Sequence, residues 1–162
     1  MLVHDFDNLV DAEGFAISNL EGTSTMPHAF SHCRRLQRLK LTWSNITGTI
    51  PPLDNCAQLH ELDFSGNQLT GQIPWDMLGS LAQNYSLRVL RLGVNSFEAS
   101  TIPDNMGVLL SKVEVLDLAS IGFGGEIPAL DLCVSLRVLD LSYNALCGQL
   151  PDFSRCQNLQ EL

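Results

Sequence analysis

The chain has 162 residues, of which 45% are hydrophobic and 17% are charged, a composition typical of a folded globular domain. Its formal net charge of -9 at pH 7 argues against a nucleic-acid partner, because binding to phosphates depends on clustered Lys and Arg. No apolar run reaches the roughly 20 residues of a membrane span, and the N-terminus carries acids where a secretory signal peptide would carry basic residues.

The first 23 residues follow no clear repeat. The stretch "FAISNLEGTSTMP", from Phe15, has the composition of an eroded repeat, but its spacing does not fit the register of the segments that follow. We therefore predict an irregular or eroded N-terminal segment over residues 1–23 and a repeat array over residues 24–162.

Five segments of similar sequence make up most of the remaining chain. They read "LQRLKLTWSNITGTIP", "LHELDFSGNQLTGQIP", "LRVLRLGVNSFEASTIP", "VEVLDLASIGFGGEIP" and "LRVLDLSYNALCGQLP", and "LQEL" begins a sixth. They start at Leu36, Leu59, Leu87, Val113, Leu136 and Leu159, so successive starts lie 23, 28, 26, 23 and 23 residues apart. The "LxxLxL" pattern places three apolar side chains on one side of a short parallel strand, which a single repeat cannot bury alone. We therefore predict coils that stack into a solenoid.

Asparagine and glycine recur at fixed positions after the predicted strands. Inward-turned amides that satisfy backbone groups are expected at Asn67, Asn95 and Asn144, as a partial asparagine ladder. The glycine position, which suits a bend that a side chain would obstruct, holds Gly48, Gly71, Gly125 and Gly148. The exceptions are Ser44 and Ile121 at the asparagine position and Ala99 at the glycine position, and the pattern does not define the turns there.

Two repeats are longer than the others, at 28 and 26 residues. Their extra chain follows Pro74 ("WDMLGSLAQNYS") and Pro103 ("DNMGVLLSKV"). We expect both excursions on the convex side of the solenoid, as short helices.

The combined pattern "LxxLxLxxNxLxGxIP" resembles the plant-type leucine-rich repeat, and the resemblance covers about residues 24–162. The family includes the ectodomains of receptor-like kinases and receptor-like proteins, as well as polygalacturonase-inhibiting proteins. The resemblance implies an α/β repeat solenoid, a leucine-rich-repeat superhelix with a parallel β-sheet on its concave face and often a second short sheet after the "LxGxIP" segment. The paired-cysteine caps of secreted members are not recognisable, and the sequence stops halfway through a strand at "LQEL", so we expect a fragment of a longer array.

Four cysteines recur at nearly the same offset between a proline and a leucine: Cys33, Cys56, Cys133 and Cys156. Their recurrence favours buried core positions, because cysteine is among the most buried residue types. Disulfides between Cys33 and Cys56, or between Cys133 and Cys156, are the alternative. Neighbouring coils stack at about 4.8 Å, which lies within the range of Cα separations that a disulfide spans. The fifth cysteine, Cys147, is expected to be more exposed.

Signals for metal binding or catalysis are absent from the sequence. His28, His32 and Cys33 lie close together, but their spacing does not match the ligand clusters of structural zinc sites. The chain contains no nucleophile elbow, phosphate-binding loop or zinc-protease motif. We therefore expect neither an enzyme nor a bound metal or other cofactor.

The outward side chains of the predicted strands should form columns across the sheet, and solenoids use such surfaces for recognition. One column holds Lys40, Asp63, Arg91, Asp117 and Asp140; its neighbour holds Arg38, Glu61, Val89, Val115, Val138 and Glu161; a third holds Trp43, Gly66, Val94, Ser120 and Tyr143. One interpretation is a solvated face in which Lys40, Asp63 and Arg91 pair across strands for little net energy. The other interpretation is a ligand-binding face.

The binding interpretation rests on large aromatic side chains at the strand ends and on arginines beside a stripe of valines. Aromatic and arginine side chains dominate the energetics of interfaces. The candidate ligand-binding residues are Trp43, Arg88, Arg91, Val115, Arg137 and Tyr143. They suit an extended peptide that carries a carboxylate or sulfate, and the neighbouring Asp117 and Asp140 favour a ligand of mixed charge.

These features predict extracellular recognition of a peptide or protein by a plant receptor-like ectodomain, with a co-receptor as a further partner. The full-length protein is expected outside the cell or attached to the plasma membrane, with glycans at the sequons of Asn45 ("NIT") and Asn84 ("NYS"). A secreted inhibitor of a microbial wall-degrading enzyme and an intracellular leucine-rich-repeat scaffold are the alternatives. Empty sequons together with reduced thiols would favour the scaffold.

Overall fold

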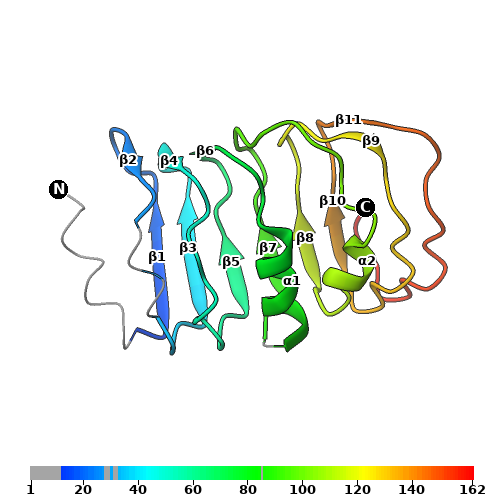
Figure 1. Cartoon of the computed structure of the whole chain (residues 1–162), viewed down its shortest axis with the longest axis horizontal. Coiled ribbons are helices and arrows are strands. Elements are labelled where there is room, and N and C mark those ends of the chain that lie inside the picture. The colour runs from blue at the N-terminus through cyan, green and yellow to red at the C-terminus, as the bar shows by residue number, and fades with distance from the viewer. Residues whose placement is uncertain (1–11, 28–29, 31–32, 85) are drawn as a thin grey trace.

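The structure is a computed structural model that describes residues 12–27, 30, 33–84 and 86–162, with only the backbone described for Asn84. Six parallel strands form a sheet in the order β1-β3-β5-β7-β8-β10. They are β1 (Gly14–Ser18), β3 (Arg38–Thr42), β5 (Glu61–Asp63), β7 (Val89–Arg91), β8 (Val115–Asp117) and β10 (Val138–Asp140). The strands stand side by side along the long axis of the molecule (Figure 1). The stacked coils that the repeats predict are therefore confirmed.

The inward leucine of each repeat builds a continuous core beneath the sheet. In register order these residues are Leu39, Leu62, Leu90, Leu116 and Leu139, each at most 2% exposed. Burying one leucine contributes roughly 1.5–3 kcal/mol relative to leaving it in water. Because a parallel register keeps every leucine on the same side, the other side of β3, β5, β7, β8 and β10 faces solvent. We call that solvent-facing side the open face.

The solenoid sheet begins before residue 24, which differs from the boundary that the sequence suggested. In β1, Phe15 and Ile17 pair in register with Leu39 and Leu41 and pack against the core. The chain from Ile17 to β2 (Ser24–Thr25) is two residues longer than the chain from Leu41 to β4 (Ile46–Gly48). This local insertion shifts the pattern after β1, which is why the repeat could not be aligned there.

The expected second sheet is present but divided in two. Its first part contains β2, β4 and β6 (Gln68–Leu69), and its second contains β9 (Gly124–Glu126) and β11 (Ala145–Cys147). These short strands run along the edge of the array at the carboxyl ends of the long strands (Figure 1).

The division falls in the coil that carries Ala99 at the glycine position. Gly71 and Gly125, at this position in the flanking coils, have φ values of 75°, in a left-handed region that disfavours alanine. Among the described residues 95–103, the coil contributes Thr101 alone, in an isolated bridge with Gly124. The coil that carries Ala99 is therefore the one that adds no strand to the second sheet.

Both long repeats form the short helices that the sequence suggested. Helix α1 (Trp75–Asn84) follows Pro74, and α2 (Met106–Leu109) follows Pro103. The two helices contact each other, and a side chain at Gly79 would lie 2.7 Å from Leu109, so glycine permits this close approach. Leu78 and Leu81 of α1 join the leucine core, which places this helix on the side of the sheet away from the open face.

The asparagine ladder is also present. In the most buried rung, the Asn67 Oδ1 atom accepts hydrogen bonds from the backbone N–H groups of Ser44 (3.1 Å) and Ile46 (3.2 Å). Its Nδ2 group donates to the carbonyls of Leu41 (2.6 Å) and Phe64 (2.9 Å). The amides of Asn95 and Asn144 bridge neighbouring coils in the same way. Each amide therefore fastens a turn to the coil before it.

The recurring cysteines are core residues, as their spacing predicts. Cys33, Cys56, Cys133 and Cys156 are at most 4% exposed, whereas Cys147 is exposed. The Cys56 thiol donates to the carbonyl of Phe30 (3.2 Å), and the Cys156 thiol donates to the carbonyl of Leu130 (3.3 Å).

These contacts show thiols that link neighbouring coils through hydrogen bonds in place of the alternative disulfides. Burial is the main cause that raises the pKa of Cys56 to about 12, and burial likewise raises the pKa of Cys133 to about 11. Both groups therefore stay protonated at neutral pH, the form that donates a hydrogen bond.

Candidate functional site

The columns expected on the open face are in register. Lys40, Asp63, Arg91, Asp117 and Asp140 are consecutive Cα partners on the five strands β3, β5, β7, β8 and β10. Val89, Val115 and Val138 are likewise partners, each partly buried, and we call them the valine stripe. The stripe and the charged column lie side by side, since their members are two residues apart on each strand.

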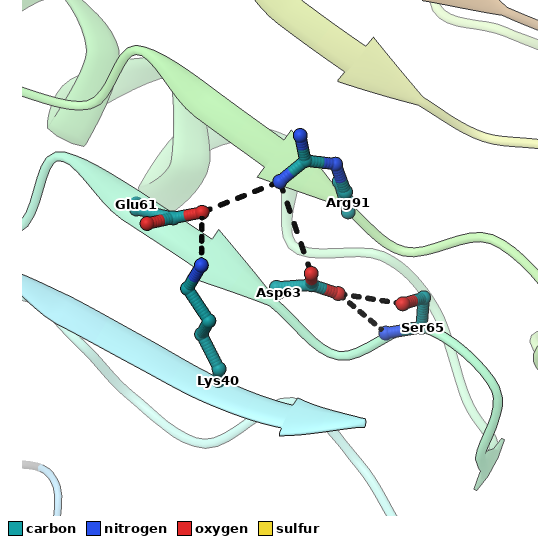
Figure 2. Close-up of polar contacts among 5 residues, drawn as sticks. All are labelled: Lys40, Glu61, Asp63, Ser65 and Arg91. Atoms are coloured by element: carbon teal, nitrogen blue, oxygen red, sulfur yellow. Dashed lines mark hydrogen bonds and ion pairs between the residues drawn. The ribbon is translucent and has the colours of Figure 1, made fainter. Parts of the chain in front are cut away.

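A network of ion pairs occupies the N-terminal part of the open face (Figure 2). The Glu61 Oε1 atom lies 2.7 Å from the Lys40 amine and 3.3 Å from Arg91 Nη1. Arg91 Nη1 also lies 3.8 Å from the Asp63 carboxylate. Such partly exposed pairs contribute about 1 kcal/mol or less each. The candidate residue Arg91 is therefore already paired, and a ligand carboxylate would have to compete with Glu61 and Asp63.

Besides contributing charge to the open face, the aspartates of the charged column accept hydrogen bonds from the turns at the strand ends. The Asp63 carboxylate accepts hydrogen bonds from the backbone N–H and the hydroxyl of Ser65 (3.1 and 2.6 Å; Figure 2). Asp140 accepts one from the N–H of Ser142 (2.9 Å). An aspartate that accepts from the residue two positions later stabilises a turn. Sequence reasoning missed this role, although the spacing in "DFS" and "DLS" carries the signal.

Asp117 is a partly buried carboxylate in the middle of the column. It accepts a hydrogen bond from the N–H of Ala119 (3.0 Å), and its Oδ1 would lie 2.5 Å from a Cβ atom placed on Gly93. Glycine at position 93 therefore leaves the space that this carboxylate fills. Burial is the main cause that raises the pKa of Asp117, and the charges of Asp140 and Asp63 raise it further. The hydrogen bond from Ala119 and the charge of Arg91 oppose that shift.

The residues of the third column lie just after the strands. They share a left-handed backbone conformation that the sequence did not reveal. Their φ values are positive: Trp43 (50°), Gly66 (70°), Val94 (56°), Ser120 (53°) and Tyr143 (55°). Residues other than glycine are strained in this left-handed region, and a β-branched residue such as Val94 is rarely found there. The side chains of Trp43, Val94 and Tyr143 are 58%, 41% and 88% exposed. Folding alone would favour glycine at these positions, so their large side chains are candidates for binding.

Trp43 is held by its neighbour in the same column. A Cβ atom at Gly66 would lie 2.3 Å from the Trp43 indole, which shows that the ring rests on the Gly66 backbone. The Trp43 N–H donates to the carbonyl of Ser65 (3.0 Å) and ties the turn to the next coil. The indole is thus presented in a fixed orientation.

The candidate binding residues fall into two groups on the open face. Arg91 and Val115 lie within β7 and β8, Arg88 directly precedes β7, Arg137 directly precedes β10, and Tyr143 follows β10. Trp43 follows β3, and four steps of about 4.8 Å between strands separate its column position from that of Tyr143, or roughly 19 Å. Trp43 therefore does not join the group around Tyr143.

The two arginines that flank the valine stripe differ in their contacts. Arg88 Nη1 donates to the carbonyl of Leu87 (2.9 Å), so this side chain lies partly against the backbone. Arg137 is exposed, and its Nη2 group lies 3.4 Å from Gln160 Oε1. Arg137 is the more accessible guanidinium of the pair.

The remaining candidate positions are distributed outside the open face. Asn45 is exposed and precedes β4, where Gln68 donates a hydrogen bond to its side chain (3.4 Å). Asn84 ends α1, and its side chain lies outside the described residues. His28 and His32 of the dismissed metal cluster also lie outside them; among the described residues, no three His, Cys, Asp or Glu side chains gather as a metal site.

Comparison with known sequences establishes what the repeats are. The model of the leucine-rich repeat family matches residues 58–80 and 135–157. The chain belongs to the leucine-rich-repeat family. Receptor-like protein 41 of Arabidopsis thaliana is 35% identical to this leucine-rich-repeat chain over 127 residues, which cover 78% of the chain and 14% of that protein. The chain thus spans about a seventh of this relative.

The solved structures similar to the leucine-rich-repeat chain include plant receptor ectodomains. The Arabidopsis receptor kinase HAESA, solved with the peptide hormone IDA and the co-receptor SERK1, matches with a TM-score of 0.72 and 31% identity. That match covers 84% of this chain and 22% of the HAESA chain. A TDR receptor matches with a TM-score of 0.76 and 29% identity, over 92% of this chain and 25% of its own. In the described part of the chain, no helix has the length and apolar character needed to cross a membrane.

Proposed function

We propose that this leucine-rich-repeat chain recognises an extracellular peptide or protein on its open face, as part of the ectodomain of a plant receptor-like protein or receptor kinase. The observation that carries the proposal is the valine stripe of three adjacent strands, flanked by Arg137 and by the strained, exposed Tyr143. Receptor-like relatives and the peptide complex of HAESA support it. A co-receptor is the second partner that we propose, and recognition requires no catalytic step.

The open face is suited to binding because its side chains are held by the sheet before a ligand arrives. Backbone ladders fix the spacing of Val89, Val115 and Val138, and turn hydrogen bonds fix the strand ends. A surface that is already ordered loses little conformational entropy when it binds. Aromatic side chains and arginines near the centre of such a surface supply most of the affinity.

Replacing Tyr143 with alanine is expected to weaken binding of the partner by about 1–3 kcal/mol, because truncation removes the exposed aromatic anchor. The partner would be captured from plant extracellular fluid on the immobilised chain, identified by mass spectrometry and measured by titration calorimetry. Leu132→Ala is the control, since Leu132 is 43% exposed in a turn between β9 and β10, outside the open face. Affinity that falls with Leu132→Ala and not with Tyr143→Ala would place the binding surface elsewhere.

We also propose that the full-length protein is extracellular or attached to the plasma membrane, with glycans on Asn45 and Asn84. Expression through a plant secretory pathway should add glycan mass at Asn45, whose side chain is exposed. Asn45→Gln should remove that mass, while Asn158→Gln, at an exposed asparagine outside any sequon, should not. Intact mass spectrometry distinguishes these results, and a secreted product with both sequons empty would contradict the proposal.

A further inference from the structure

The arrangement of charged side chains differs between the N-terminal and C-terminal parts of the open face. In its N-terminal part, Lys40 and Arg91 are paired with Glu61, and Arg91 also approaches Asp63 (Figure 2). These two cations and two carboxylates balance one another, and the exposed Arg38 of β3 remains outside the network. A basic ligand therefore gains little in this part, because it would have to separate an existing pair beside a further cation.

The C-terminal part of the same face carries two neighbouring carboxylates, and the exposed Arg137 directly precedes strand β10. Asp117 and Asp140 are Cα partners on β8 and β10, and among residues 12–27, 30, 33–84 and 86–162 no ion pair involves either. Each accepts a hydrogen bond from its own turn, which fixes the carboxylate without neutralising it. Burial is the main cause that raises the pKa of Asp117, and the charges of Asp140 and Asp63 raise it further, against the opposing charge of Arg91. A cation placed beside the two carboxylates would offset their mutual repulsion.

An apolar surface lies next to these carboxylates on the same strands. Val115 and Val138 precede Asp117 and Asp140 by two residues on the same strands, which places the two columns roughly 7 Å apart. An extended peptide that crosses the strands projects alternate side chains in opposite directions. One set then covers the valine stripe, and the other reaches the aspartates.

Small residues follow the charged column two positions later, after β7, β8 and β10, at Gly93, Ala119 and Ser142. The Asp117 carboxylate fills the space at Gly93 and Ala119 is buried, so Ser142 is the exposed position of the three. The alkyl stem of Lys or Arg can lie over such a surface while its charged end contacts a carboxylate.

We propose that β7, β8 and β10 of the open face bind an extended peptide in which apolar and basic side chains alternate, with the basic side chains at Asp117 and Asp140. The inference rests on the proposed function and specifies the chemistry of its ligand. It narrows the mixed-charge peptide expected from the sequence, because Arg91 is paired within the protein and is not available to a ligand carboxylate. Charge complementarity at Asp117 and Asp140 selects basic side chains over acidic ones at these two positions.

The test uses fluorescence anisotropy of the whole chain with three labelled synthetic peptides: Val-Arg-Val-Arg-Val, Val-Gln-Val-Gln-Val and Val-Glu-Val-Glu-Val. The arginine peptide is expected to bind about tenfold more tightly than the glutamine peptide at low salt, and the glutamate peptide more weakly than both. The preference should shrink as salt increases, because exposed charges are screened.

The double substitution Asp117→Asn and Asp140→Asn should abolish the preference for arginine over glutamine. Asparagine keeps an oxygen that can accept the N–H groups of Ala119 and Ser142, so the turns are preserved, and an unchanged thermal midpoint would verify this. Asp152→Asn is the matched control, because Asp152 accepts from Ser154 in the same kind of turn outside the six-stranded sheet. It should leave the preference intact.

The outcomes separate this inference from the proposed function. Equal binding of the arginine and glutamine peptides, no binding of any of the three, or an arginine preference that survives the double substitution would each overturn the inference. The proposed function would still stand if a captured natural partner lost affinity with Tyr143→Ala. A partner insensitive to Tyr143→Ala would overturn the proposed function whatever the synthetic peptides do.

Discussion

Replacing Leu116 with alanine is expected to lower the free energy of unfolding by roughly 2–5 kcal/mol, which is the usual cost of a large-to-small substitution in a packed core. Leu116 is 1% exposed at the centre of β8, between Leu90 and Leu139 on the neighbouring strands. The cavity would open between three coils, each of which depends on its neighbours for burial. Chemical denaturation followed by circular dichroism measures the change.

Val115→Ala is the matched control on the same strand, because Val115 points to the open face and is only partly buried. It should cost less than Leu116→Ala by at least about 1 kcal/mol. Equal shifts of the denaturation midpoint for the two variants would contradict the assignment of inward and outward positions in β8.

Replacing Asn67 with alanine is expected to destabilise the chain by roughly 2–4 kcal/mol, because buried backbone groups on two coils lose their partner. The N–H groups of Ser44 and Ile46 lose an acceptor, and the carbonyls of Leu41 and Phe64 lose a donor. Asn67 is 7% exposed, so water replaces these bonds poorly. Thermal and chemical unfolding both measure the loss.

Asn158→Ala provides the comparison for Asn67→Ala. Asn158 is exposed and makes a hydrogen bond to the carbonyl of Val134 (2.9 Å), so its loss should change stability by less than about 0.5 kcal/mol. Hydrogen exchange should also quicken at Ser44 and Ile46 in the Asn67 variant. Unchanged exchange at both amides would show that the ladder does not hold this turn.

The repeat pattern was sufficient to predict the core, because an inward leucine on a parallel strand leaves little freedom in the register. The same reasoning missed β1, since two inserted residues before β2 displace the pattern although Phe15 and Ile17 occupy inward positions. The spacing of leucines therefore identifies coils of standard length, but it does not identify a coil that carries an insertion.

The face of the candidate site was predictable and its chemistry was not. The columns follow from the period, but the left-handed backbone at Trp43 and Tyr143 leaves no trace in residue type, because neither side chain favours that conformation. The sequence also suggested direct pairing of Lys40, Asp63 and Arg91. In the structure the Lys40 amine reaches across to Glu61, because Asp63 is short and turned towards Ser65. Arg91 is itself paired with Glu61 and Asp63, so its guanidinium is not free for a ligand.

The divided second sheet has a mechanical consequence for the length of the array. The six-stranded sheet continues without a break from β7 to β8, whereas the edge sheet is interrupted between β6 and β9. Backbone hydrogen bonds still cross that interruption, because Ser96 and Glu98 donate to the carbonyls of Leu69 and Gly71, and Gly124 donates to the carbonyl of Ser100. We therefore expect the coil of residues 95–103 to keep a constant distance between its neighbours. The separation of the Trp43 and Tyr143 coils is then set before a ligand binds, which limits the length of ligand that can contact both aromatic residues.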